Sequence, residues 1–298
     1  MREGALIYNP AAGRRRAERL RAAVGAALHA GGWRVEAHAT DAVGAATTMA
    51  RQLAASGSVE AVFALGGDGT LREVAAGLLG SEVALGPLPG GTSNVLTRSL
   101  GVPRDPLAAA RLLAGAPRRA IRAGRCDGEP FLMMVSAGFD AAVVATMDGA
   151  LKARWGLAGV AWTGLPAWWR YDYPLVEVGT GDVRDAAPFV AVCNIPHYGG
   201  PYCLAPGARC DDDSLELVLY RRRGRLAALG FLRDLARGRH HHRPDVAIRT
   251  CTGEVTLDGP AGTPLQVDGD PWRGPLPLTV GVHQHPLWIL APPATPSA

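Results

Sequence analysis

The stretch AVFALGGDGTLREVAAGLLG, residues 61–80, decides the fold class of this chain. Its apolar beginning indicates a buried strand, and the glycine loop GGDGT leads directly into a helical pattern. Backbone N–H groups at such a strand–loop–helix junction can bind a phosphate. Asp68, however, places a carboxylate in the loop, where it would repel an anion. A tight turn alone accounts for the glycines but not for this aspartate.

Two common nucleotide-binding motifs are excluded at this loop. A G-x-x-x-x-G-K-[ST] sequence is absent, and the only lysine of the chain is Lys152. The dinucleotide motif G-x-G-x-x-G fails as well, because Arg72 stands where its third glycine belongs.

The flanking segments repeat the same unit. ALIYN, WRVEAHAT, VEAVFAL and EVALGPLP have the pattern of strands, and they alternate with helical patterns at about residues 13–32, 42–55 and 70–79. Such alternation predicts a parallel sheet with helices on both faces, and ligands bind such sheets at the carboxyl ends of the strands. Asn9, Thr40, GGDGT and the second glycine loop, PGGTSN, all fall at those ends.

Two of these loops carry further polar signals. The second glycine loop is expected to open a helix, with Thr92 or Ser93 as its cap. Arg14 to Arg16 lie in the first turns of the helix after the first strand, where positive charge opposes the helix dipole. An anionic ligand explains these arginines; a solvent-facing basic turn is the alternative.

After about Ile121 the pattern changes to strand-like runs separated by Gly, Pro and Asp turns. This pattern predicts a largely antiparallel second domain, so we place an α/β domain at 1–122 and a mainly-β domain at 123–285.

The chain has 298 residues, 48% hydrophobic and 19% charged, which suits globular domains. Its five cysteines form no C-x-x-C pair, and no uncharged stretch is long enough to span a bilayer, so a cytoplasmic protein is expected.

A family resemblance rests on NPAAG, GGDGTLREV and PLPGGTSNVLTRSLGVP in this order, followed by SAGFDAAVV, CNIPHYGGPYCLAPGARCDDDSLELVL and LQVDGDPW. This set resembles the diacylglycerol kinase catalytic family, which includes bacterial lipid kinases and sphingosine kinase-like enzymes. The resemblance implies a Rossmann-like α/β nucleotide-binding domain and a β-sandwich-like lipid-substrate domain, with residues 286–298 returning to the first. It also implies transfer of the γ-phosphoryl group of ATP to a diacylglycerol-like or sphingoid-like hydroxyl at a cleft between the domains.

The same resemblance assigns site residues. Asp270 matches the catalytic carboxylate, and Asp212 matches a magnesium-linked position flanked by Arg209 and Ser214, with Asp213 as the alternative to Asp212. Asp68 is expected to act with the magnesium ion that arrives with the nucleotide, which would remove its repulsion. The expected nucleotide-binding positions, which include further residues of the same loops, are Asn9, Pro10, Gly13, Arg14, Thr40, Gly66, Gly67, Asp68, Gly69, Thr70, Leu71, Arg72, Gly91, Thr92 and Asn94.

The chain departs from the family pattern at three places. Asp270 stands where many relatives have glutamate, Asn94-Val95 replaces Asn-Asp, and DDDS replaces DDG. From the residues alone, DDD also fits an acidic turn and Asp270 a hairpin turn, because Asp-Gly is a strong turn signal. The departures favour a shifted substrate preference or a weakened enzyme.

A tryptophan-rich segment bears on the substrate. Its large apolar residues follow helical spacing and form either a core-packing face or a face for a lipid chain or bilayer: Trp155, Ala158, Trp162, Leu165 and Trp169. We therefore expect an ATP- and Mg²⁺-dependent lipid kinase, cytoplasmic and peripheral at the inner membrane face. Its expected partners are a lipid substrate and a membrane surface, without nucleic acid, and homodimerisation is left open. The alternatives are an NAD kinase-like phosphotransferase, which shares GGDGT, and a non-enzymatic nucleotide or lipid binder.

Overall fold

The computed structural model describes residues 1–10, 14–146, 166, 168–181 and 183–293, without the side chains of residues 14–16. The chain forms two compact units: unit 1 comprises Met1–Arg122 and Gln284–Ala298, and unit 2 comprises Ala123–His283. Four of the five residues of the predicted tryptophan-rich face lie outside the described residues; Trp169 is described.

Unit 1 alternates strands and helices along the chain. Its elements are β1 (Arg2–Tyr8), α1 (Arg14–Ala30), β2 (Trp33–Ala39), α2 (Ala45–Ser56), β3 (Ala61–Gly66), α3 (Asp68–Leu78), β4 (Ala84–Pro89), α4 (Val95–Ser99) and α5 (Pro106–Gly115).

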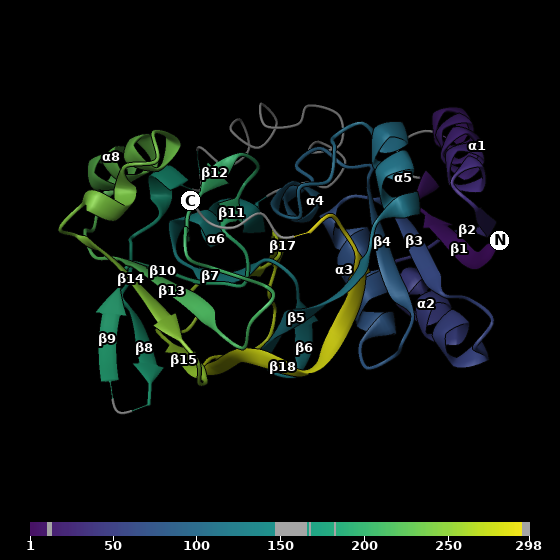
Figure 1. Ribbon diagram of the computed structural model, residues 1–298. Coiled ribbons are helices and arrows are strands. Elements are labelled where there is room, and N and C mark those ends of the chain that lie inside the picture. The colour runs from purple at the N-terminus through teal and green to yellow at the C-terminus, as the bar shows by residue number, and fades with distance from the viewer. Residues whose placement is uncertain (11–13, 147–165, 167, 182, 294–298) are drawn as a thin grey trace. The chain divides into compact units, whose positions relative to one another are not determined.

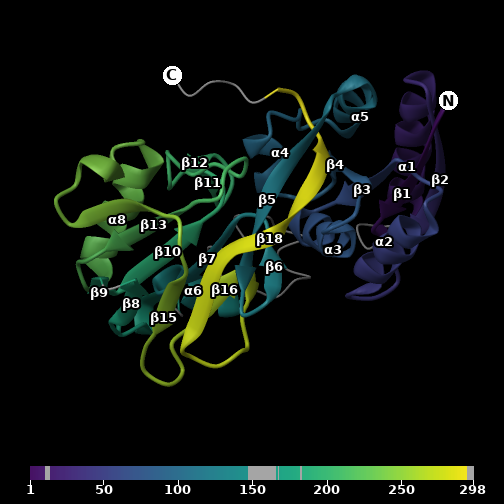
Figure 2. The same cartoon turned by 60° about the horizontal axis from the view of Figure 1, so that its bottom comes forward.

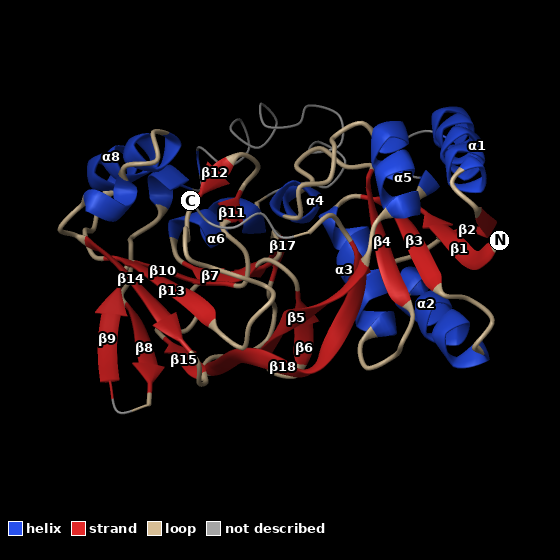
Figure 3. Ribbon diagram, viewed as in Figure 1, coloured by secondary structure: helices blue, strands red, loops and turns tan. Residues whose placement is uncertain are grey.

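The strands of unit 1 form a parallel sheet in the order β2-β1-β3-β4, extended by the end of β18 (Leu278–Leu290) beside β4. Every residue of β3 and β4 is buried, as expected for strands covered on both faces. α1 packs beside α5 and α2 beside α3, and Figure 3 shows the two pairs on opposite faces of the strands. The α/β prediction is confirmed.

Unit 2 is built mainly from short antiparallel strands. Its elements are β6 (Glu129–Phe131), β7 (Met134–Ala137), α6 (Phe139–Ala145), β8 (Val176–Thr180), β9 (Val183–Ala187), β10 (Phe189–Cys193), β11 (His197–Tyr198), β12 (Tyr202–Cys203), β13 (Leu215–Tyr220), α8 (Arg225–Ala236), the 3₁₀ helix η2 (His240–His242), β14 (Val246–Cys251), β15 (Val255–Asp258), β16 (Leu265–Val267) and β17 (Asp270–Pro271).

Two groups of strands share one apolar core in unit 2. One runs in the order β14-β13-β10-β7-β16-β17, and the other comprises the start of β18 with β15, β8 and β9 (Figure 1). Val135 and Val192 of the first group join Val178 and Leu257 of the second in one buried cluster. This arrangement confirms the predicted antiparallel, sandwich-like unit.

Two strands contribute residues to both units. β5 (Arg118–Cys126) crosses the boundary near Arg122, and β18, the long yellow strand of Figure 2, crosses it near Gln284. The first half of β18 pairs with β15, and its end pairs with β4 through Ile289 and Leu85. None of the described helices combines the length and the hydrophobicity that a membrane span requires.

Candidate active site

The two glycine loops of unit 1 lie directly against each other. Gly90 N–H donates to the carbonyl of Gly66 at 2.7 Å, and a Cβ on Gly91 would lie 2.6 Å from the Cα of Gly67. Real Cβ atoms do not approach backbone so closely, so Gly91 permits a contact that other residues would prevent. The loops after β3 and β4 therefore form one continuous backbone surface at the carboxyl end of the sheet.

Asp68 connects these loops. It is the first residue of α3, and its two carboxylate oxygens accept the N–H groups of Val95 and Leu96, each at 3.1 Å. The carboxylate thus caps the N-terminus of α4 from another helix. Asp68 is therefore part of the architecture of the site, a role that the sequence did not reveal.

The predicted cap of α4 is wrong. Neither Thr92 nor Ser93 is the N-cap; that residue is Asn94, which adopts the left-handed conformation with φ 48°. Its side chain instead exchanges two hydrogen bonds with Gly91, at 2.9 and 2.7 Å. Asn tolerates this conformation, and Asp68 then supplies the capping oxygen.

The loop–helix junction at α3 retains the donors that a phosphate needs. Gly69 and Thr70 lie in the first turn of α3, whose N–H groups lack acceptors within the helix. Gly66 is required beneath them, because a Cβ there would lie 2.5 Å from Thr70. Leu71 is buried, Arg72 is partly exposed, and Thr92 is exposed in the second loop.

A cavity of about 1030 Å³ lies in unit 1, and its lining includes residues at the ends of β1 and β2 together with Thr70 and Glu73 of α3. Four of the predicted nucleotide-binding residues line it: Asn9, Pro10, Thr40 and Thr70. Thr40 N–H donates to the carbonyl of Tyr8 at 3.0 Å and Asn9 N–H to that of Leu65 at 3.3 Å, which fixes the ends of β1 and β2. Gly13 and the side chain of Arg14 are outside the part of the chain that the structure describes.

Sequence reasoning missed the other nine residues that line this cavity, among them Tyr8, Glu18 and Glu73. Tyr8 donates to Glu18 at 2.5 Å, and this hydrogen bond raises the pKa of Tyr8 and lowers the pKa of Glu18. Glu73 accepts the N–H of Ala46 at 3.2 Å and so joins α3 to α2. Glu73 belongs to the quoted GGDGTLREV motif, so a signal for it was present; none marked Tyr8 or Glu18.

In unit 2, Asp270 follows a tight hairpin turn. β16 and β17 pair through Val267 and Asp270, and the two residues between them, Asp268 and Gly269, have φ values of 53° and 84°. Positive φ at both central residues is typical of a type I′ hairpin. Asp270 is exposed as the first residue of β17. The hairpin interpretation and a catalytic role for Asp270 are thus compatible.

Asp268, which sequence reasoning also missed, anchors this hairpin. It is buried, and its oxygens accept the N–H groups of Leu132, Met133 and Met134 at 2.8, 2.8 and 3.0 Å. Three backbone donors stabilise a buried carboxylate. The turn before Asp270 is therefore fixed to the start of β7.

A second buried carboxylate lies behind the hairpin. Asp140 in α6 accepts from Ser136 Oγ at 2.5 Å, and Ser136 accepts from Gln266 Nε2 at 2.7 Å. Gln266 Oε1 accepts the N–H of Gly269 at 2.7 Å, which extends the network to the turn. Burial raises the pKa of Asp140, against the opposing effect of its hydrogen-bond donors.

The predicted magnesium-linked residues share one loop before β13. Asp212 Oδ1 accepts both the N–H and the hydroxyl of Ser214, at 2.9 and 2.7 Å, whereas Arg209 forms a bidentate pair with Asp211, both bonds at 3.0 Å. Asp212 and Asp213 are exposed. The acidic-turn interpretation is thus correct for the local geometry, and a metal role for Asp212 is compatible with it.

Glu216 supports this loop. It is buried in β13 and accepts the N–H of Gly207 at 3.0 Å; burial raises its pKa. Among the described residues, no group of three or more His, Cys, Asp or Glu side chains is arranged to hold a metal ion.

Comparison with known families accounts for both units. Residues 3–126 match the diacylglycerol kinase catalytic domain, and residues 133–291 match the YegS C-terminal NAD kinase beta sandwich-like domain. The chain belongs to the YegS-like lipid kinase family.

Sequence relatives agree with this assignment. Proteins described as "Probable lipid kinase YegS-like" from Pseudomonas fluorescens and Pseudomonas aeruginosa are 31% and 32% identical to this lipid kinase; each match covers 86% of this chain and 85% and 84% of those proteins. A Bacillus anthracis str. Sterne structure described as a "putative diacylglycerol kinase" has the same fold. Its TM-score is 0.80 at 22% identity, over 98% of this kinase and 95% of that chain.

Proposed function

We propose that this kinase transfers the γ-phosphoryl group of ATP to the hydroxyl group of a lipid in a magnesium-dependent reaction. The observation that carries the proposal is the joining of the two glycine loops through Asp68 at the N-terminus of α3. Two close backbones and a helix N-terminus form a preorganised anion site, which phosphoryl transfer uses for positioning.

The adjoining cavity supports a nucleotide as the phosphate donor. Its rim combines the hydroxyls of Thr40 and Thr70 with the amide of Asn9, and its volume suits a small molecule of that size. ATP is the donor we propose, because Thr70 of the first glycine loop lines this cavity and the N-terminus of α3 offers backbone donors for its phosphates.

The residues present fit magnesium as the accompanying ion. Carboxylate oxygens are its preferred protein ligands, and it keeps several waters. In unit 2, Asp212 with the backbone of Arg209 and Ser214 would hold magnesium. In unit 1, Asp68 would act with magnesium that arrives with the nucleotide. The ion would neutralise charge on the phosphates.

Asp270 is the proposed general base. The Asp268 anchor and the Gln266 contact fix the turn, so the exposed carboxylate of Asp270 has a defined starting position. Its side chain is one methylene shorter than glutamate, so it must approach the acceptor hydroxyl more closely or act through one water.

Transfer of labelled phosphate from ATP to a fractionated lipid extract, followed by mass identification of the product, tests the function. We expect a labelled lipid only when magnesium is present, and Asp270→Asn should reduce turnover by about 100-fold or more, as removal of a general base does. Asp258→Asn is a matched control, because Asp258 is also an exposed aspartate at the end of a strand in unit 2.

Parallel reactions separate the alternatives. Labelling of NAD without labelling of any lipid would replace the proposal with an NAD kinase. Nucleotide binding without turnover on any acceptor would indicate a binding protein.

A further inference from the structure

One segment of unit 2 is strongly basic. Residues 221–245 contain eight arginines and two aspartates, a net charge of +6. The whole chain has 31 basic and 27 acidic residues, a net charge of +4, so all other residues together carry −2. The segment runs from the end of β13 through α8 and η2 to the start of β14.

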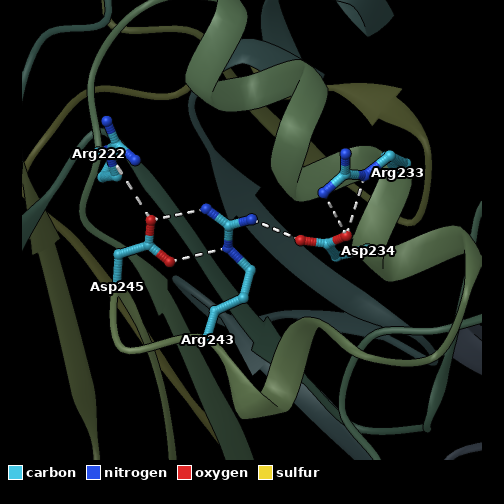
Figure 4. Close-up of polar contacts among 5 residues, drawn as sticks. All are labelled: Arg222, Arg233, Asp234, Arg243 and Asp245. Carbon is cyan, nitrogen blue, oxygen red and sulfur yellow. Dashed lines mark hydrogen bonds and ion pairs between the residues drawn. The ribbon is translucent and has the colours of Figure 1, made fainter.

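An ion-pair network holds this segment together while leaving positive charge at its surface (Figure 4). Arg243, largely buried, binds Asp245 through two hydrogen bonds of 2.8 Å and Asp234 through one of 2.5 Å. Arg233 pairs with the other oxygen of Asp234 at 3.0 Å, and Arg222 reaches Asp245 only at 4.0 Å. Three arginines thus share two carboxylates, and the two exposed arginines stand on the outside.

Large apolar side chains are exposed beside these arginines. Leu226 and Leu229 of α8 are 85% and 49% exposed and lie three residues apart, on one face of the helix. The opposite face of α8 is buried through Ala228, Phe231 and Leu235.

An exposed tryptophan extends this apolar surface. Trp169 is 58% exposed, and the guanidinium of Arg225, the first residue of α8, lies 4.7 Å from the centre of its ring. An aromatic ring, two leucines and several arginines therefore share one outer surface, which we call the α8 surface: Trp169, Arg222, Arg225, Leu226, Leu229 and Arg233.

We propose that the α8 surface docks on a membrane that contains anionic phospholipids. Apolar side chains enter the boundary between headgroups and acyl chains, tryptophan prefers that depth, and arginines bind the lipid phosphates. The charge of the segment is complementary to such a membrane. The inference goes beyond phosphoryl transfer, because none of these residues belongs to the proposed active site.

Vesicle sedimentation with the full chain tests the docking. Vesicles of phosphatidylcholine with phosphatidylglycerol should bind the protein, pure phosphatidylcholine should bind it much less, and added salt should weaken the binding. Each arginine near an anionic membrane surface contributes about 1 kcal/mol to membrane binding, which is about fivefold in the partition coefficient. The double variant Arg222→Gln with Arg225→Gln should therefore bind vesicles roughly 25-fold more weakly. Leu226→Ser with Leu229→Ser should weaken binding to the same vesicles even at low salt.

Matched controls use exposed residues of unit 1. Arg104→Gln with Arg111→Gln removes the same charge, and Leu112→Ser replaces an exposed leucine of α5. These proteins should bind as the parent does. Thermal unfolding of every variant should match the parent, because all the altered side chains are exposed.

Three results would overturn the proposal. The first is equal binding to neutral and anionic vesicles, and the second is that both α8 variants bind vesicles as strongly as the parent. The third is that the leucine variant changes its oligomeric state and keeps its vesicle binding. The last would make the α8 surface an interface between copies of the chain.

Phosphorylation of a short-chain, water-soluble diacylglycerol separates this test from the proposed function. Variants that lose vesicle binding should keep turnover on that acceptor, whereas failure of the parent on every acceptor would refute the kinase assignment and leave the docking result standing.

Discussion

Replacement of Asp68 by asparagine tests how the two glycine loops are held together. The carboxylate accepts two N–H groups at 3.1 Å, from Val95 and Leu96. Asparagine is isosteric but offers one oxygen, so its amide N–H₂ would face the second donor. Loss of a hydrogen bond to a charged group costs about 1.5–3 kcal/mol. We therefore expect the free energy of unfolding of unit 1 to fall by about 2 kcal/mol. Its Tm should then fall by roughly 4–8 °C.

Scanning calorimetry measures this loss, and Asp105→Asn is its control. Asp105 caps α5 within its own helix through a 2.8 Å bond from Ala108 N–H, and asparagine caps nearly as well as aspartate. The control should therefore change Tm little. Equal Tm values for Asp68→Asn and the parent would refute the capping argument.

The Asp68→Asn variant also separates the two roles of Asp68, as an anchor of the loops and as a partner of magnesium. If Asp68 acts with magnesium, turnover at a temperature well below Tm should fall by far more than the small unfolded fraction explains, and the magnesium concentration for half-maximal rate should rise. Unchanged magnesium-dependent transfer would leave Asp68 as a loop anchor only.

Other predictions concern the glycine contact, the hairpin anchor and the ion-pair network. Gly91→Ala should abolish nucleotide binding measured by calorimetry, because its Cβ would meet the Gly67 backbone, whereas Gly25→Ala, with open space in α1, should raise stability by up to about 1 kcal/mol. Asparagine at position 268 tolerates the positive φ but removes the charged acceptor of three N–H groups. Urea unfolding of Asp268→Asn should therefore show a free energy of unfolding that is lower by roughly 3 kcal/mol. A decrease below about 1 kcal/mol would contradict the anchoring role of Asp268. Arg243 lowers the pKa values of the two aspartates it binds, so its stabilisation is present above their unfolded value of 3.8 and is lost as pH falls through the lowered values. The urea midpoints of the parent and Arg243→Gln should therefore differ at about pH 7 and converge toward about pH 3, and a constant difference would count against this linkage.

Local patterns were sufficient to predict the elements that position the site. Apolar runs, helical periodicity and Gly-rich junctions place β3, α3 and the second glycine loop correctly, because each signal lies within a few residues of its effect. The antiparallel character of unit 2 likewise follows from short strands and frequent turns.

Long-range anchors could not be predicted in the same way. Asp68 meets its partners 27 and 28 residues away, and Asp268 meets Leu132 across 136 residues. Nothing local distinguishes a carboxylate that binds distant backbone N–H groups from one that faces a ligand. For this reason Thr92 and Ser93 were expected as caps, and Asp268 was overlooked beside Asp270.

The course of β18 has a consequence for how the protein is made. Its second half supplies the buried residues Leu287 and Ile289 to unit 1, yet it is translated only after all of unit 2. On the ribosome, the apolar edge of β4 must therefore wait for a partner that lies about 200 residues further along the chain. Until β18 has been synthesised, unit 1 exposes an unpaired strand edge, and such edges promote aggregation. Nascent unit 1 is therefore expected to depend on chaperones or on rapid synthesis of unit 2.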